Sequence, residues 1–257
     1  MRQTPPGGLA FIRRLAELND APAAASKEVF AGRLSRWFDW TDAISLSGAL
    51  ACPPGQAREP GAGAAALDDD EREFVRVRAA LAGLARANAG RSAPARASRP
   101  AVVVADAPAA PAADFAPHRR RYVAAQQAME TQVAALRTRL RERLGAASPE
   151  LARLAALDAV MEQVLGRRER ALLATVPRWL ELHFEQLARH GAGERAAAPG
   201  ATPGRATMPG STPARPGGWE DVFRQRLAGV LLAELDLRLQ PVEALLQALR
   251  PSPERHE

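Results

Sequence analysis

Aromatic and carboxylate side chains gather in RWFDWTDAISLSGAL, residues 36–50, within a chain rich in alanine, arginine and leucine. Rings beside carboxylates can form a sugar-binding platform or a ligand pocket. On a helix that turns about 100° per residue, however, Asp39 and Asp42 fall on the side opposite Trp37. The rings and the acids therefore do not converge, and the pattern predicts a core stripe around Trp37 with a solvated back.

The groups that most often perform chemistry are few and scattered. The histidines are His118, His183, His190 and His256, and no cysteine or carboxylate stands near them at the spacing of zinc ligands. The single cysteine, Cys52, lies in a proline-flanked segment, which is a poor setting for a nucleophile. The GxSxG, Walker and Rossmann glycine motifs are also missing. We therefore expect no enzyme activity, no cofactor and no metal site.

A basic turn is the first candidate binding element. HRRRY, residues 118–122, places Arg119, Arg120 and Arg121 at a predicted helix start, where cations oppose the helix dipole. This mildly unfavourable placement would suit an acidic partner, and a solvated basic turn is the alternative interpretation.

Two charged residues within a predicted helical seam, Asp158 and Arg168, are the second candidate. Two seams have alternating spacings of four and three, which predicts paired helices. The first runs through Tyr122, Gln126, Met129, Val133, Leu136 and Leu140, and the second through Leu151, Leu154, Asp158, Met161, Leu165, Arg168 and Leu172. An unpaired buried ion costs several kcal/mol. Either the two charges form a polar layer or partner contact, or the seam drifts and both side chains reach its edge.

The positive charge is unevenly distributed along the chain. The formal net charge is +6, and residues 115–190 hold 13 arginines against eight acids, whereas residues 219–257 hold five arginines against seven acids. An arginine-rich segment invites a nucleic-acid interpretation. It lacks, however, the interleaved aromatics on which bases stack, so nucleic acid is the second choice of partner.

Helical periodicity accounts for all the elements that would position these residues. We expect the hairpin's first helix to end at Gly145 and its second to begin at the cap Ser148. Pro177 should interrupt the continuation, and Gly191 should close it. A break is also expected at Pro241. The expected helices cover about 9–19, 27–50, 68–88, 115–145, 148–190 and 219–249.

Two tracts lack large apolar residues. Residues 89–114 and 191–218 are rich in Ala, Pro, Gly, Ser and Thr, so they cannot bury enough surface to offset the entropy of ordering. We predict disordered linkers there. They would separate an N-terminal helical unit at 1–88, a long helical hairpin at 115–190 and a C-terminal helix at 219–250 that completes the bundle. The predicted fold class is all-α, an elongated helical bundle or coiled-coil hairpin.

Four stretches resemble a family of uncharacterised proteobacterial proteins, the domain of unknown function 3348 family. They are RWFDWTDAISLSGAL, FAPHRRRYVAAQQAM, LARLAALDAVMEQVLGRRERALLATVP and VLLAELDLRLQPVEALLQAL. The resemblance implies no catalytic residue at any position. Genes of this family can lie beside genes for membrane-anchored and outer-membrane-protein-A-like proteins, which implies an accessory role in a bacterial envelope complex.

We therefore expect a cytoplasmic, non-enzymatic protein–protein interaction or scaffold protein. Its partner would be another protein, acidic or membrane-associated, and the alternative is nucleic acid bound by the arginine-rich hairpin. No apolar run approaches the roughly 20 residues of a membrane span, so we expect no direct membrane insertion. The pattern leaves the oligomeric state open.

Overall fold

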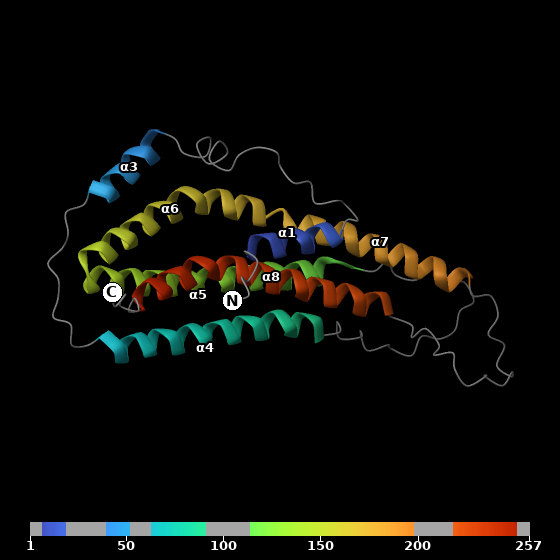
Figure 1. Ribbon diagram of the computed structural model, residues 1–257. Coiled ribbons are helices and arrows are strands. Elements are labelled where there is room, and N and C mark those ends of the chain that lie inside the picture. Colours follow the sequence, from blue (N-terminus) through green and yellow to red (C-terminus); the bar gives the residue numbers. More distant parts are fainter. Residues whose placement is uncertain (1–6, 19–39, 52–62, 91–113, 198–217, 251–257) are drawn as a thin grey trace, which may run out of the picture.

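The computed structural model describes residues 7–18, 40–51, 63–90, 114–197 and 218–250. Almost all of these residues are helical and none of them forms a strand, which confirms the all-α fold class. The helices are α1 (Gly7–Leu18), α3 (Trp40–Ala51), α4 (Gly63–Gly90), α5 (Ala116–Ala147), α6 (Pro149–Leu173), α7 (Val176–Ala197) and α8 (Gly218–Leu249). Figure 1 shows that most of them follow one long axis, so the bundle is elongated.

Helix α8 is the centre of the bundle. It packs against α1, α4, α5 and α7, and its apolar side chains, such as Phe223, Leu231 and Leu239, are fully buried. The sequence predicted a break at Pro241, but α8 continues through this residue. A proline inside a helix costs about 3 kcal/mol. Burial of Val242 and Leu245 beyond it offsets this cost, because each fully buried large apolar side chain contributes about 1.5–3 kcal/mol.

Helices α5 and α6 form the predicted antiparallel hairpin (Figure 1). The first seam is confirmed, since all its residues are buried except the half-buried Gln126. α5 passes Gly145 and ends two residues later. Ser148 is the N-cap of α6, and its Oγ accepts a hydrogen bond of 3.2 Å from the backbone N–H of Leu151. Supercoiling of the two helices stays a prediction.

The joint between α6 and α7 is short, as Pro177 predicted. Ala174 and Thr175 interrupt the helix, and α7 begins again at Val176. Gly191 does not close α7, which continues to Ala197. The first part of the tract that we predicted as a linker at 191–218 is therefore helical, whereas its residues 198–217 lie outside the described residues, as do residues 91–113 of the other predicted linker.

Helix α3 lies on the outer side of α6 (Figure 1), with the opposite face from the predicted one turned inward. Its least exposed residues are Asp42, Leu46 and Ala49, whereas Trp40 is 80% exposed and Ile44 is also exposed. The predicted core stripe is therefore wrong for the described part of this segment. Trp37 and the rest of the expected helix before Trp40 lie outside the described residues.

The acidic residues at 68–71 include one that links two helices. Helix α4 begins at Gly63, so Asp70 lies well inside it and is 2% exposed. Its carboxylate accepts hydrogen bonds from Nε of Arg139 at 2.8 Å and from Nε of Arg143 at 3.1 Å, both on α5. Asp70 therefore joins α4 to the hairpin.

The described residues before residue 91 share the core of the hairpin. Phe11 and Leu18 of α1, and Val77 and Leu81 of α4, are buried together with side chains of α5 and α8. We had grouped residues 1–88 as an N-terminal helical unit, and its described helices α1 and α4 are part of one bundle with the rest. None of the described helices combines the length and the apolar character that a membrane crossing requires.

Candidate partner-binding groove

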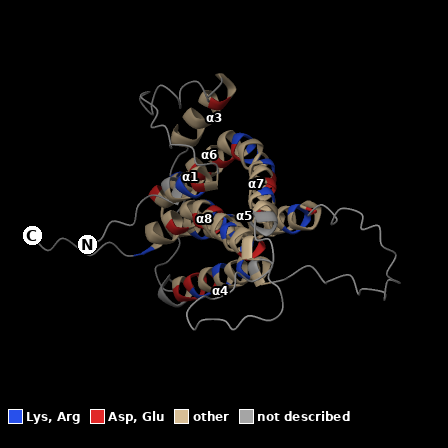
Figure 2. Ribbon diagram, turned by 90° about the vertical axis from the view of Figure 1, so that its right-hand side faces the viewer, with Lys and Arg blue, Asp and Glu red and all other residues tan. Residues whose placement is uncertain are grey.

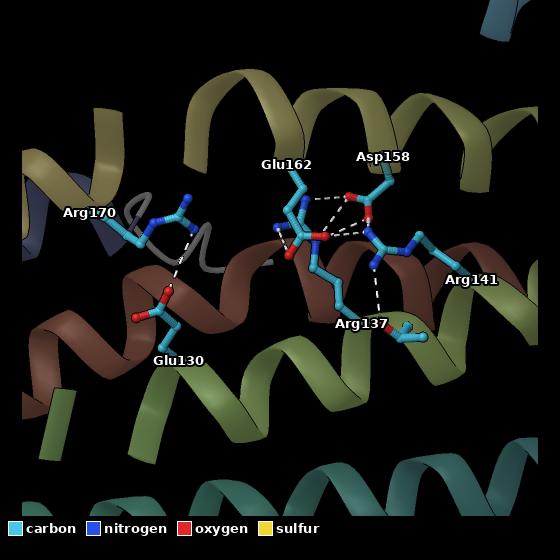
Figure 3. A network of polar contacts seen from close by, with 7 residues as sticks. Glu130, Arg137, Arg141, Asp158, Glu162 and Arg170 are labelled. Atoms are coloured by element: carbon cyan, nitrogen blue, oxygen red, sulfur yellow. Dashed lines mark hydrogen bonds and ion pairs between the residues drawn. The ribbon is translucent and has the colours of Figure 1, made fainter. Parts of the chain in front are cut away.

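A network of ion pairs holds α5 and α6 together near the middle of the hairpin (Figure 3). Arg137 donates to both carboxylate oxygens of Asp158, with Nη2–Oδ1 at 2.7 Å and Nε–Oδ2 at 3.0 Å. Arg141 lies one turn further along α5 and donates to Glu162 at 2.5 Å and to Asp158 at 3.3 Å. Arginine and carboxylate held in this two-pronged geometry form strong, directional pairs. The network therefore fixes the register of the two helices.

A groove opens beside this network between α5, α6 and α8. It has a volume of about 410 Å³ and is lined mainly by apolar surface. Val133 of α5, Met161 and Leu165 of α6, and Leu237 and Pro241 of α8 form its apolar wall. Volumes of roughly 300–1,000 Å³ are typical of ligand-binding pockets, so the groove has room for several large side chains or a small ligand.

The second predicted seam is not buried in the way we expected. Its residues from Leu151 to Leu165 are half-buried, and Arg168 and Leu172 are exposed. The buried residues of α6 are instead Ala155, Val164 and Leu173. The C-terminal half of the seam, from Met161 to Leu172, lines the groove.

The charged residues at the mouth of the groove carry both signs. Arg168, Glu169 and Arg170 line the α6 side, and Glu130 lines the α5 side. Arg170 lies 3.5 Å from Glu130, so this pair spans the two helices (Figure 3). An incoming surface would therefore meet an apolar centre with a mixed charged rim.

A buried polar cluster lies under the floor of the groove. Glu234 of α8 is 0% exposed, and its carboxylate accepts hydrogen bonds from the Tyr122 hydroxyl at 2.5 Å and from Gln126 at 3.1 Å. Arg238, which lines the groove, donates to the same carboxylate at 2.9 and 3.0 Å. Burial, with the neighbouring Glu234 carboxylate, raises the pKa of Tyr122 far above its ordinary value. The tyrosine is therefore a permanent hydrogen-bond donor.

The candidate residues predicted from the sequence do not form a single site. Arg119 and Arg120 are exposed in the first turns of α5, and Arg121 is half-buried there. Asp158 lies in the ion-pair network, 37 residues after Arg121 in the chain, and is half-buried, whereas Arg168 is at the mouth of the groove. Asp158 therefore lies in a polar layer between the two helices, which was one of the two interpretations. Arg168 lies at the edge of the seam, which was the other.

Sequence reasoning missed Glu234 and its partners. The signal was present, since Glu234 interrupts the apolar run VLLAELDL at a position about one helical turn from Leu231 and two turns from Leu227. The side chains that pair with it, Tyr122 and Gln126, are four residues apart on one helix face. Only the packing of α5 on α8 brings the three together. Among the described residues, no three His, Cys, Asp or Glu side chains gather in an arrangement that would hold a metal ion.

Comparison with known proteins agrees with the resemblance carried by the four stretches. A family model with the description protein of unknown function (DUF3348) matches residues 1–251. No curated protein and no solved structure matches the chain. Since the match covers nearly the whole sequence, the chain belongs to the DUF3348 family of proteins of unknown function.

Proposed function

We propose that this protein is a non-enzymatic protein–protein interaction or scaffold protein, and that its groove binds an amphipathic helix of a partner. The observation that carries the proposal is the open half of the α6 seam. Met161, Leu165 and Leu172 have the spacing at which helices pair, yet they line an open groove, and Leu172 is exposed. A partner helix with apolar side chains at i, i+3 and i+4 would fill this space.

The rim supports a helix more than a small anionic ligand. Arginines and glutamates alternate around the groove, and a helix pair places both signs along the edges of its apolar seam. The apolar wall would bury the partner's side chains, and the rim would select its orientation. We further propose that the partner belongs to a bacterial envelope complex and that the protein binds it from the cytoplasm.

Nucleic acid is the weaker alternative because many hairpin arginines already pair with acids. Arg137 and Arg141 pair with Asp158 and Glu162, and Arg139 and Arg143 pair with Asp70. Figure 2 likewise places acidic and basic residues beside one another on α4 and α6. A protein that binds the phosphate backbone needs basic side chains gathered on one face.

The proposal is tested by photo-crosslinking in the native host. A photoreactive phenylalanine analogue replaces Leu172, which is 65% exposed at the groove, so the substitution should leave the fold intact. We expect a defined adduct that protease removes and nuclease leaves unchanged. The matched control carries the same analogue at Val75, an exposed apolar residue of α4, and should give no such adduct. Adding Leu165→Glu should abolish the adduct from position 172.

The alternative is tested by reversing the charge of the basic turn. If the protein binds nucleic acid, the wild type should show a steep salt dependence in fluorescence anisotropy, and the Arg119→Glu, Arg120→Glu, Arg121→Glu variant a shallower one. A nuclease-sensitive adduct at position 172, or a steep salt slope lost in this variant, would replace our proposal by the alternative. No adduct at position 172 would remove the groove as the docking site.

A further inference from the structure

An aromatic cluster closes the end of the bundle where α5 begins. Phe115, just before α5, packs against Phe184 of α7 and Phe223 of α8, with ring centroids 5.6 and 6.1 Å away. Phe184 and Phe223 are 4.9 Å apart, and the ring of Trp219 meets Phe184 at 5.2 Å. These rings join α5, α7 and α8 at this end of the molecule.

Two histidines lie inside this cluster. The ring of His118 is 5.1 Å from Phe223 and 5.6 Å from Phe184, so it sits between α7 and α8. His183 is 4% exposed and lies 6.4 Å from the same Phe223 ring. Both imidazoles therefore contact one phenylalanine from two different helices, α5 and α7.

Arg226 of α8 contacts the buried ring of His183. Nη1 of Arg226 lies 3.0 Å from Nε2 of His183. A guanidinium can only donate, so a hydrogen bond between these two atoms requires a neutral imidazole that accepts at Nε2. A second proton on Nε2 would remove this bond and leave an imidazolium against a guanidinium.

The surroundings of His118 also favour the neutral imidazole. Burial lowers the pKa of His118, Arg121 and Arg224 lower it further, and Asp114 opposes them. The nearby arginines therefore lower the pKa of His118 more than Asp114 raises it. The charged groups on the segments near the two rings include Asp114, Arg119, Arg120 and Arg121 next to His118, Glu220, Asp221, Arg224 and Arg226 on α8, Arg178, Glu181, Glu185 and Arg189 on α7, and Arg13, Arg14 and Glu17 on α1, which packs on α7 and α8.

We propose that this end of the bundle is an acid-operated latch, in which protonation of His118 and His183 releases the start of α5 and the start of α8 from α7. Two positive charges would enter an apolar cluster that already faces Arg224 and Arg226. The remainder of the bundle would stay folded, because its core around Met129, Leu140 and Leu239 is apolar.

The direction of the pH effect follows from the neutral state of the rings. An unfolded histidine binds a proton below a pKa of about 6.5, whereas the pKa of the half-buried His118 is lowered. The stability that the neutral ring contributes is thus present above about pH 6.5 and is lost as the pH falls below this value. Arg119 and Arg120 directly follow His118, so opening the latch would also reposition the exposed basic turn.

The test uses Trp219 as a local reporter, since its ring lies against Phe184 in the cluster. In a full-length variant with Trp37, Trp40 and Trp179 changed to phenylalanine, Trp219 is the only remaining tryptophan. Its emission should shift to longer wavelength between about pH 6.5 and 5, as the ring meets water. Helicity measured by far-ultraviolet circular dichroism should stay nearly constant over this range.

Variants at the histidines separate the latch from general acid unfolding. His118→Phe with His183→Gln keeps an aromatic ring and a hydrogen-bond acceptor but removes both protonation sites, so the emission shift should disappear. His190→Gln is the control, because His190 is exposed on the same helix, and it should retain the shift. If the double variant does not fold, His118→Phe is tested alone. Its transition should be less steep than that of the wild type, because about one proton fewer is bound. The latch is refuted if emission and helicity change together in the wild type, or if the transition persists unchanged in these histidine variants.

Discussion

Trp219 lies directly over the backbone of Gly191, so that a β-carbon on the glycine would come within 2.5 Å of Cδ1 of the indole. The two residues belong to α8 and α7, and the missing side chain lets the helices approach closely. Gly191 is thus a packing residue in the middle of a helix and not the helix end that we predicted from the sequence.

We expect Gly191→Ala to lower the free energy of unfolding by about 1–3 kcal/mol, because the ring and the helices must shift to admit the methyl group. Gly193→Ala is the matched control on the same helix, since its β-carbon would meet no atom within 4 Å. This variant should gain up to about 1 kcal/mol from helix propensity. Urea denaturation of both variants measures the difference, and equal stabilities would contradict the close approach.

Removing one partner of the Glu234–Arg238 pair should lower the free energy of unfolding more than replacing both partners by apolar residues. Glu234→Ala leaves the guanidinium of Arg238, whose side chain is 9% exposed, without its carboxylate, and we expect a loss of about 3–5 kcal/mol. Glu234→Leu combined with Arg238→Leu removes both charges and should lose less than the single variant. Tyr122→Phe, which removes only the hydroxyl donor, should cost about 1–2 kcal/mol. A double variant less stable than Glu234→Ala would contradict the expectation that the unpaired guanidinium of Arg238 causes most of the loss in the single variant.

Asp70 should contribute more to stability than the acids beside it in the sequence. Asp70→Asn weakens hydrogen bonds to two arginines of α5 at a buried carboxylate, so we expect a loss of about 1–3 kcal/mol in thermal unfolding. Asp69 pairs only with Arg72 of its own helix at a solvated position, so Asp69→Asn should stay within about 0.5 kcal/mol. Similar effects of the two substitutions would contradict the role of Asp70 in joining α4 to α5.

Trp40 should contribute little to the stability of the isolated protein. Because its side chain is largely exposed on the outward face of α3, Trp40→Ala should change the free energy of unfolding by less than about 0.5 kcal/mol. Trp219→Ala should cost about 3 kcal/mol or more, because this ring packs on Phe184. Chemical denaturation compares the two, and a large loss for Trp40→Ala would return the opening aromatic stretch to the core that the sequence predicted.

Local signals were sufficient for the hairpin. The four-and-three spacing of the first seam, the Ser148 cap and the break before Pro177 all act within one or two turns of a helix, so their outcome does not depend on the rest of the chain. Gly191 and Pro241 were expected to interrupt a helix, but both lie inside one, for the opposite reason. Their local preference for ending a helix was outweighed by packing against residues that are distant in the sequence.

The candidate site needed the tertiary structure in two respects. Helical geometry separated the two faces of α3 correctly, but it could not determine which face would meet α6, because both carry some apolar side chains. The heptad spacing of the second seam was likewise visible in the sequence. That part of it lines an open groove depends on how α6 lies over α5 and α8, which no local pattern encodes.

The two-residue joint between α6 and α7 should couple the orientations of these helices. The Thr175 hydroxyl donates to the carbonyl of Leu172 at 2.7 Å, and the backbone N–H of Arg178 donates to the carbonyl of Thr175 at 3.0 Å. Because only Ala174 and Thr175 separate the two helices, we expect a change in the tilt of α6 to change the orientation of α7 as well. Binding of a helix in the groove would therefore alter the contacts that α7 makes with Phe223 and Trp219 of α8 at the far end of the molecule.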